Sequence, residues 1–345
     1  MVYTKPEVMI VRNIDELIKT ISTIVEKHKI SEGRYSRYLW NNEKVNRKMG
    51  INEYGCADAA NILYSIGEFE GDPAKRAEWI KALQEMQHPD TGIFEEGTHH
   101  IIHTTAHCIS ALELFDAKPL YPVKEFEKYK NTDELYKLLD NLLWKERCWP
   151  QSHQGAGIFA IFAVMEMADL DWQDAYFSWL DKEADPETGL WRKGHMPEGM
   201  EFYTTIGCAF HYVFNYEHAN RPLPYPERII DTCINMYRNK DNGGFGRYDF
   251  GHNVQFFEMD FVYLVTRSLA QTGYRYNECI DMLKEFSDDF IDMLYSLDPD
   301  THDGMNDIHM LFGTVCCLAE LQQALRGHVV STKPLKLVLD RRPFI

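Results

Sequence analysis

The sequence predicts an all-α protein built as an (α/α)6 toroid, a barrel in which apolar inner helices are surrounded by amphipathic outer helices. Three observations lead to this prediction. A glycine-containing turn recurs along the chain, each turn precedes an apolar run of helical length, and the segments before the turns carry stripes of charge. Self-similarity at a period of several tens of residues is typical of folds built from stacked supersecondary units.

Four copies of the recurring unit are clear. The turns read HPDTGIF at 88–94, DPETGLW at 185–191, DNGGFG at 241–246 and PDTHDGM at 299–305. The apolar runs that follow them occupy 99–115, 200–216, 254–273 and 307–325. Each unit is therefore interpreted as an outer helix, a turn and an inner helix.

Two further hairpins complete the set. An amphipathic segment at 13–30 precedes an apolar segment at 52–69, and a segment at 132–146 precedes one at 155–170. The six predicted turns are marked by Gly50, Gly92, Pro150, Gly189, Gly243 and Gly304. Six such hairpins close naturally into a ring.

The two kinds of helix differ in polarity. The segments 73–87 and 278–294 carry charge on one face, as expected at a surface, whereas the apolar runs are hydrophobic almost all round and must be buried. Small residues in these runs allow close helix packing: Ala59, Ala60, Ser110, Ala111, Ala160, Ala163, Gly207, Ala209 and Gly313.

The 345 residues contain no Pro/Gly/Ser-rich linker, so we expect a single toroid domain over residues 1–330. Residues 331–345 form a basic tail with Pro334 and Pro343, which excludes a continuous helix and predicts an extended segment. Two roles remain open for this tail: a strap across the ring, or docking on a second subunit in a homo-oligomer.

The formal net charge of -17 argues against binding to nucleic acid or to an anionic membrane, since both require a basic surface. The chain shows no signal peptide, and no run approaches the roughly 18 apolar residues of a membrane span. The eight cysteines have no CxxC spacing and are expected to be buried, reduced thiols. The sequence therefore predicts a cytoplasmic protein with a small-molecule substrate.

The segments DTGIFEEGTHHIIHTTAHCISALELF and DNGGFG resemble the repeats of the prenyltransferase and squalene-cyclase group, and this resemblance implies an α/α toroid. The chemical motifs of that group are missing. No D-x-D-D acid of the squalene-type cyclases occurs. The segment 103–112 is similar to the histidine-containing helix of protein prenyltransferases, but no Asp-x-Cys partner follows at the matching place. The resemblance therefore describes a divergent member.

Polar residues gather at the starts of the inner helices, where a toroid has its cavity. The sharpest signal is a group of histidines, His99, His100, His103 and His107, which share one face if the helix already runs at His99. His103 and His107, one helical turn apart, are candidate ligands of a divalent metal. The alternative is that these imidazoles only line a wet cavity, so a cofactor is not required by the sequence.

Carboxylates in apolar helices are candidate acid or base groups, because burial raises their pKa. The predicted catalytic residues are Glu258, His103, His153, Glu201, Asp58 and Asp307. Asp260 shares the segment of Glu258. For both of these residues the alternative is an ion pair with Arg247 or Arg267 that serves packing.

The predicted substrate contacts are Trp149, Trp191, Tyr203, Tyr248, His252 and His309. Aromatic side chains at these turns suit stacking on sugar faces and equally suit stabilisation of a carbocation. The first hypothesis is thus an enzyme that acts by acid/base chemistry on a small carbohydrate or uronide, through hydrolysis, elimination or epimerisation. The alternatives are a divergent terpenoid cyclase or prenyltransferase-like enzyme, and a non-catalytic toroid that binds a ligand.

Overall fold

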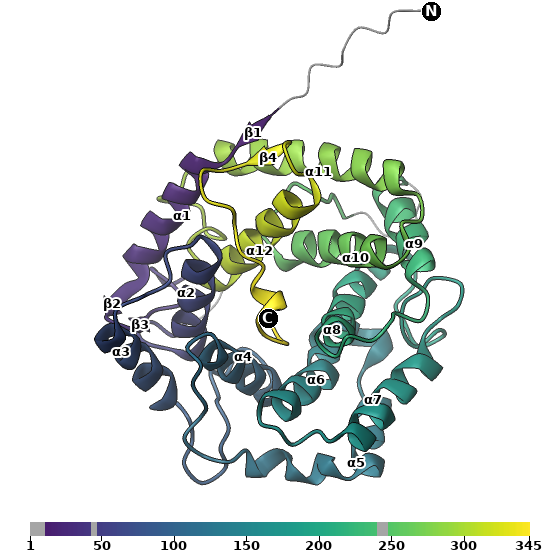
Figure 1. Ribbon diagram of the computed structural model, residues 1–345, viewed down its shortest axis with the longest axis horizontal. Helices are drawn as coiled ribbons and strands as arrows, with labels where there is room; N and C mark the ends of the chain where they lie inside the picture. Colours follow the sequence, from purple (N-terminus) through teal and green to yellow (C-terminus); the bar gives the residue numbers. More distant parts are fainter. Residues whose placement is uncertain (1–10, 43–46, 240–247) are drawn as a thin grey trace, which may run out of the picture.

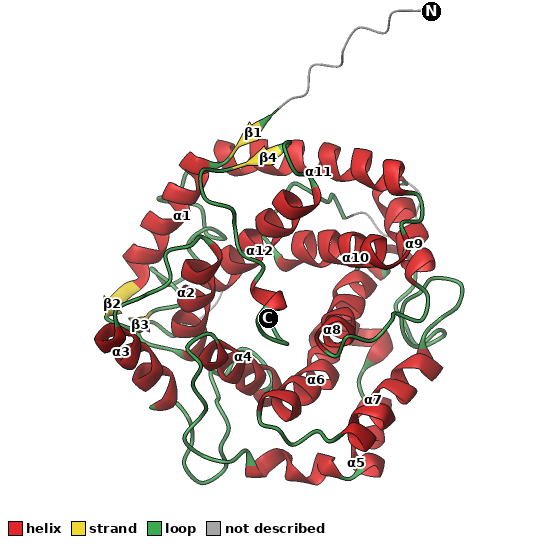
Figure 2. Cartoon of the chain, in the orientation of Figure 1, coloured by secondary structure: helices red, strands yellow, loops and turns green. Residues whose placement is uncertain are grey.

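The computed structural model describes residues 11–42, 47–239 and 248–345, and these residues form a mostly helical protein with little strand (Figure 2). The predicted helical class is therefore confirmed. None of the helices in these three ranges is long and apolar enough to cross a bilayer.

The helices alternate in position along the chain. The even-numbered ones surround the centre of the molecule in Figure 1, and we call them the inner helices: α2 (Glu53–Ser65), α4 (Ile101–Glu113), α6 (Trp144–Val164), α8 (Thr204–His218), α10 (Phe256–Thr272) and α12 (Ile308–Ala324). The odd-numbered ones lie outside them: α1 (Asp15–His28), α3 (Pro73–Gln84), α5 (Thr132–Asp140), α7 (Leu170–Glu183), α9 (Pro226–Arg238) and α11 (Tyr276–Ser296).

Each inner helix packs on its two inner neighbours. The contacts run from α2 to α4, α6, α8, α10 and α12 in turn, and α12 packs back on α2. Burial follows the predicted polarity, since α12 is buried over almost its whole length, whereas α1 buries only one face, formed by Leu17, Ile21, Ile24, Val25 and His28. The apolar runs thus meet one another, and the charged stripes face outward.

The recurring turn corresponds to a recurring loop. The backbone N–H of Gly92 donates to His88 O at 2.8 Å, and that of Gly189 donates to Asp185 O at 2.7 Å. Both glycines have positive φ, 78° and 76°, a conformation that other residues rarely adopt. The predicted turn at Gly243, the fifth of the six, lies outside the described residues.

The predicted boundary at Pro150 is displaced toward the N-terminus. The helical run α6 (Trp144–Val164) consists of two helices that meet at a kink at Arg147, where φ is -150° and ψ is 46°, and Pro150 lies inside the second of them. Proline is tolerated there because it lies in the first turn after the kink, where its missing N–H has no partner to lose. The preceding helix is correspondingly shorter than the predicted 132–146 and ends at Asp140.

The described residues also form two pairs of short strands. Strand β1 (Arg12–Asn13) pairs in parallel with β4 (Val329–Val330) and so links the N-terminal and C-terminal parts of the chain. Strand β2 (Lys29–Ser31) pairs antiparallel with β3 (Arg34–Tyr35). The 3-10 helices are η1 (Lys124–Lys130), η2 (Gly199–Glu201) and η3 (Val338–Asp340).

The tail enters the centre of the molecule. After β4, residues 331–345 run inward through η3, and the end of the chain lies among the inner helices (Figure 1). Phe344 is completely buried, and its ring lies 5.1 Å from that of His103 and 5.5 Å from that of Phe214. The tail therefore ends among the inner helices, packed against α4 and α8.

Candidate functional site

A cavity of about 100 Å³ lies among the inner helices. Its polar wall consists of five histidines and one aspartate: His99, His103, His153, His211, His309 and Asp260. Its apolar wall is formed by Trp149, Pro150, Phe210, Phe256, Met310 and Ile345. Five inner helices, the loop before α4 and the tail thus contribute to one cavity, which joins residues far apart in the sequence.

The imidazoles pack against one another. The rings of His99 and His103 lie 4.7 Å apart, His103 and His153 4.4 Å, and His153 and His211 6.0 Å. Burial lowers the pKa of His103 and His153 well below the usual value and that of His211 to about 3. These three histidines are therefore neutral at pH 7. The Nε2 atom of His153 has no hydrogen-bond partner among the described residues.

The helix of the histidine cluster begins later than predicted. Helix α4 starts at Ile101, and the exposed His100 caps it by accepting a hydrogen bond from the N–H of Ile102. His99 precedes the helix and still reaches the cavity through its loop. His100 does not line the cavity.

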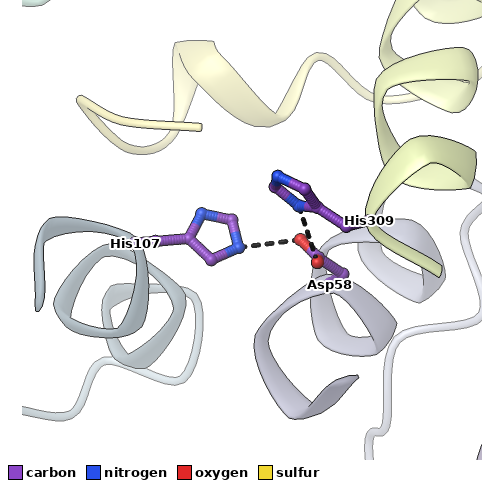
Figure 3. A group of neighbouring side chains, drawn as sticks. All are labelled: Asp58, His107 and His309. Carbon is purple, nitrogen blue, oxygen red and sulfur yellow. Dashed lines mark hydrogen bonds and ion pairs between the residues drawn. The ribbon is translucent and has the colours of Figure 1, made fainter. Parts of the chain in front are cut away.

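Asp58 joins two of the imidazoles (Figure 3). His107 donates from Nε2 to Oδ1 of Asp58 at 2.7 Å, and His309 donates from Nδ1 to Oδ2 at 2.9 Å. Burial alone would raise the pKa of Asp58, but its interactions with His309 and His107 outweigh burial and lower it. Burial lowers the pKa of His107 to about 4, so the neutral imidazole of His107 donates to an ionised carboxylate, which also accepts the hydrogen bond of His309.

These three side chains also have the composition of a metal site. The carboxylate oxygen and the two ring nitrogens all lie within 4.8 Å of one another. The predicted pair of ligands was His103 and His107. Only His107 belongs to this group, because Nδ1 of His103 is hydrogen-bonded to the hydroxyl of Tyr54 instead.

Asp260 is a carboxyl group without a partner. It is fully buried, and neither of its oxygens has a hydrogen-bond partner among the described residues. Burial and the nearby charge of Glu258 raise its pKa well above the usual value. At neutral pH Asp260 is therefore an uncharged acid, and it is the carboxyl group that the described chain contributes to the cavity wall.

Gly207 on α8 makes room for this acid. A Cβ atom at Gly207 would lie 2.2 Å from Cδ1 of Trp149 and 2.7 Å from Oδ2 of Asp260. Only glycine allows both side chains to approach α8 so closely.

Glu258 lies beside this cavity but does not line it. An oxygen of its carboxyl group accepts a hydrogen bond from Tyr248 Oη at 2.7 Å, and burial raises the pKa of Glu258 to about 8. The ring of Tyr248 stacks on that of Tyr203 at 5.1 Å. Of the two predicted ion-pair partners, Arg247 is outside the described residues, and Arg267 pairs with Glu320.

The remaining predicted residues lie elsewhere. Asp307 caps α12 and accepts from Arg37 Nε at 2.9 Å, which gives it a structural role. Trp191 is fully buried and donates to Leu180 O at 3.0 Å, also as part of the core. Glu201 and His252 are exposed and do not line the cavity.

The structure thus gathers four of the predicted residues at the cavity, His103, His153, His309 and Trp149, with Asp58 and His107 directly behind His309. Sequence reasoning missed His211 and Tyr54. His211 was detectable, because it is a polar residue inside the apolar run 200–216.

Comparison with known protein families, with curated proteins and with solved structures found no match to this chain.

Proposed function

We propose that the protein is an (α/α)6 toroid that catalyses proton transfer on a small carbohydrate or uronide in its central cavity. The closed sequence of contacts among the inner helices supports the toroid, as does the placement of the outer helices (Figure 1). The enzymatic part of the proposal depends on one observation: an uncharged carboxylic acid, Asp260, and an uncharged imidazole with an open nitrogen, His153, share one cavity.

Such a pair is poised for acid/base work. At neutral pH a carboxyl group with a raised pKa still carries its proton and an imidazole with a lowered pKa has a free nitrogen lone pair, so the two groups are in the protonation states that an acid and a base require. His153 would remove a proton from the carbon next to a carbonyl group, and Asp260 would protonate the carbonyl oxygen. The product of these two transfers is an enol. Epimerisation follows when the enol carbon regains a proton on its opposite face, and elimination follows when the enol expels a leaving group from the next carbon with the proton held by His153; in both reactions the enol oxygen returns its proton to Asp260.

The geometry favours these reactions over glycoside hydrolysis. Hydrolysis by the usual mechanism requires two carboxyl groups on opposite sides of the bond, about 5–10 Å apart. The described residues contribute one carboxyl group to the cavity, since Glu258 is bonded to Tyr248 beside it. The cavity is also smaller than the roughly 300–1,000 Å³ of pockets for larger ligands, which favours a small substrate over an oligosaccharide.

Deuterium exchange tests this proposal. The protein is incubated in D₂O with a panel of reducing sugars, simple glycosides and unsaturated uronides, and uptake of deuterium at carbon is followed by NMR. We expect Asp260→Asn and His153→Gln to lower the rate about 10²- to 10⁴-fold, the usual contribution of a general acid or base. Asp171→Asn and His195→Gln, at exposed positions, serve as matched controls.

Unchanged rates in both site variants would contradict the assignment of the acid and the base. Binding of a panel member without any exchange would instead favour the non-catalytic, ligand-binding alternative.

A cyclase-like activity is the second candidate, because the uncharged Asp260 lies in a wall with Trp149, Phe210 and Phe256. Aromatic faces stabilise carbocations, and a buried carboxylic acid can protonate an alkene. The small cavity argues against a long polyene. Adding a prenyl diphosphate and a polyene to the panel separates the two candidates, because only the second predicts their turnover.

A further inference from the structure

We infer that Asp58, His107 and His309 bind one divalent transition-metal ion, zinc being the best match, at the wall of the central cavity. The inference is independent of the proposed function, because neither Asp260 nor His153 is among the three ligands. The residues come from α2, α4 and α12, so three inner helices would be joined by the ion (Figure 3).

The distances are close to those of a bound site. Zinc is held at about 2.0–2.2 Å by histidine nitrogens and carboxylate oxygens, which places ligand atoms roughly 3.4 Å apart in a tetrahedral site. The two nitrogens now lie 2.7 Å and 2.9 Å from the oxygens of Asp58. Each nitrogen–oxygen pair would separate by about half an ångström to admit the ion, and the two nitrogens, which lie within 4.8 Å of each other, would take up the same spacing.

The ligand types select the metal. Two imidazoles and one carboxylate suit zinc and its first-row neighbours, whereas magnesium and calcium prefer sites made of oxygen alone. None of the three residues belongs to an Asp-x-Cys motif, so this ligand set differs from the one that the family resemblance would imply.

The protons on the two imidazoles can be accommodated by a change of ring nitrogen. In the hydrogen-bonded form, His107 donates a proton from Nε2 and His309 donates one from Nδ1, as their bonds to Asp58 require. On binding, each imidazole would offer that nitrogen to the metal and hold its proton on the other one. Nδ1 of His107 has no partner among the described residues and is therefore available for this proton.

The position of His309 gives the site access to the cavity. Asp58 and His107 are fully enclosed, whereas His309 lines the cavity wall. The ion would therefore lie behind the ring of His309, held by three ligands of the described chain. Structural zinc sites usually have four protein ligands, whereas catalytic ones have three and leave a fourth position for water.

One positive charge opposes the ion. Arg342, on the tail, is fully buried, and its charge interacts with Asp58 and with His107. The guanidinium nitrogens have no hydrogen-bond partner among the described residues. The negative charge of Asp58 offsets Arg342, and removing Arg342 should therefore favour cation binding.

Metal titration of the full chain tests the inference. The protein is stripped with a chelator, and Zn²⁺ is titrated calorimetrically while Co²⁺ binding is followed by visible absorption. We expect one equivalent of Zn²⁺, competition by Co²⁺ with ligand-field bands of a low-coordinate nitrogen and oxygen site, and no competition by Mg²⁺. His107→Gln and His309→Gln should each weaken the affinity for Zn²⁺ by at least about 10- to 100-fold, which is the loss expected on removing a residue that only orients a metal ligand.

His195→Gln removes an exposed imidazole and should leave the affinity unchanged. Arg342→Met should bind zinc at least as tightly as the wild type, which keeps the inference testable if the ligand variants do not fold. Wild-type protein without a one-equivalent Co²⁺ spectrum, or with an affinity that survives both ligand substitutions, would overturn the inference.

Discussion

Glu258 and Asp260 show how two carboxyl groups on one helix acquire different roles. Both lie on α10 and are fully buried. Glu258 accepts hydrogen bonds from Tyr248 and Asn253, whereas Asp260 has no partner among the described residues and faces the cavity. Burial raises the pKa of both, so the difference between them lies in their contacts. Asp260 can therefore donate to a ligand, while Glu258 holds Tyr248.

The first prediction concerns the pH dependence of stability. The pKa of Glu258 is about 8 in the folded protein and near 4.5 in the unfolded chain. Between these values the folded state retains a proton that the unfolded state has lost, so the free energy of unfolding falls as the pH rises from about 4.5 to 8. Because one pKa unit corresponds to about 1.4 kcal/mol, the loss is on the order of 2–5 kcal/mol.

Glu258→Gln should reduce this dependence, because an amide accepts the hydrogen bond of Tyr248 but does not titrate. Urea unfolding of both proteins between pH 5 and pH 8 measures the difference in slope. Glu125→Gln, at an exposed position, is the control and should keep the wild-type slope. Equal slopes for all three proteins would show that Glu258 does not hold its proton.

For single residues, the sequence indicated which polar side chains would be buried but not which residues they would contact. A charged or polar residue within an apolar run must be satisfied or functional, and that rule identifies Asp58, His107, Glu258 and Asp260. It cannot show that Asp58 meets His309, because 251 positions separate them and only the closed arrangement of α2, α4 and α12 brings them together.

Among the helices, the sequence predicted the pattern better than the boundaries. The alternation of apolar and charged segments depends on burial and was confirmed, since it is repeated along each helix. The start of α6 was not predictable in the same way, because Pro150 is compatible both with a turn and with the first turn of a helix. The position of Pro150 in a helix follows from the kink at Arg147. The backbone conformation of one residue does not change the pattern of apolar residues, so the sequence could not predict this kink.

The second prediction concerns Gly155 on α6, where neighbouring helices pack too closely to admit a side chain. A Cβ atom there would lie 2.8 Å from Oη of Tyr212 and 2.9 Å from Cδ2 of Leu139. Gly155→Ala should therefore destabilise the protein by about 1–3 kcal/mol, although alanine in an open helix position would stabilise it by about 1 kcal/mol. Thermal and urea unfolding measure the change.

Gly71→Ala is the matched control, since a Cβ atom at Gly71 would meet nothing within 4 Å. A Gly155→Ala protein as stable as this control would contradict the packing of α6 against α8 and α5.

For the whole molecule, the tail could be predicted as extended but not placed. Pro334 and Pro343 exclude a continuous helix. An extended tail of this composition suits a strap across the inner helices as well as docking on another subunit, so the sequence does not decide between the two roles. The outcome depends on space among the inner helices, which accept Phe344 between His103 and Phe214. That space exists only once the inner helices have packed together, so no single segment of the sequence predicts it.

The burial of Phe344 gives the last prediction. Because this ring is 0% exposed at the centre of the molecule, Phe344→Ala should leave a cavity and lower the free energy of unfolding by about 3–5 kcal/mol. Leu120→Ala, at a loop residue that is 56% exposed, should change it by less than about 0.5 kcal/mol. Urea unfolding of the three proteins measures both values. Since Phe344 also contacts the ring of His103, the substitution should enlarge the imidazole-lined cavity and admit larger ligands. A Phe344→Ala protein as stable as Leu120→Ala would mean that the tail does not pack among the inner helices in solution.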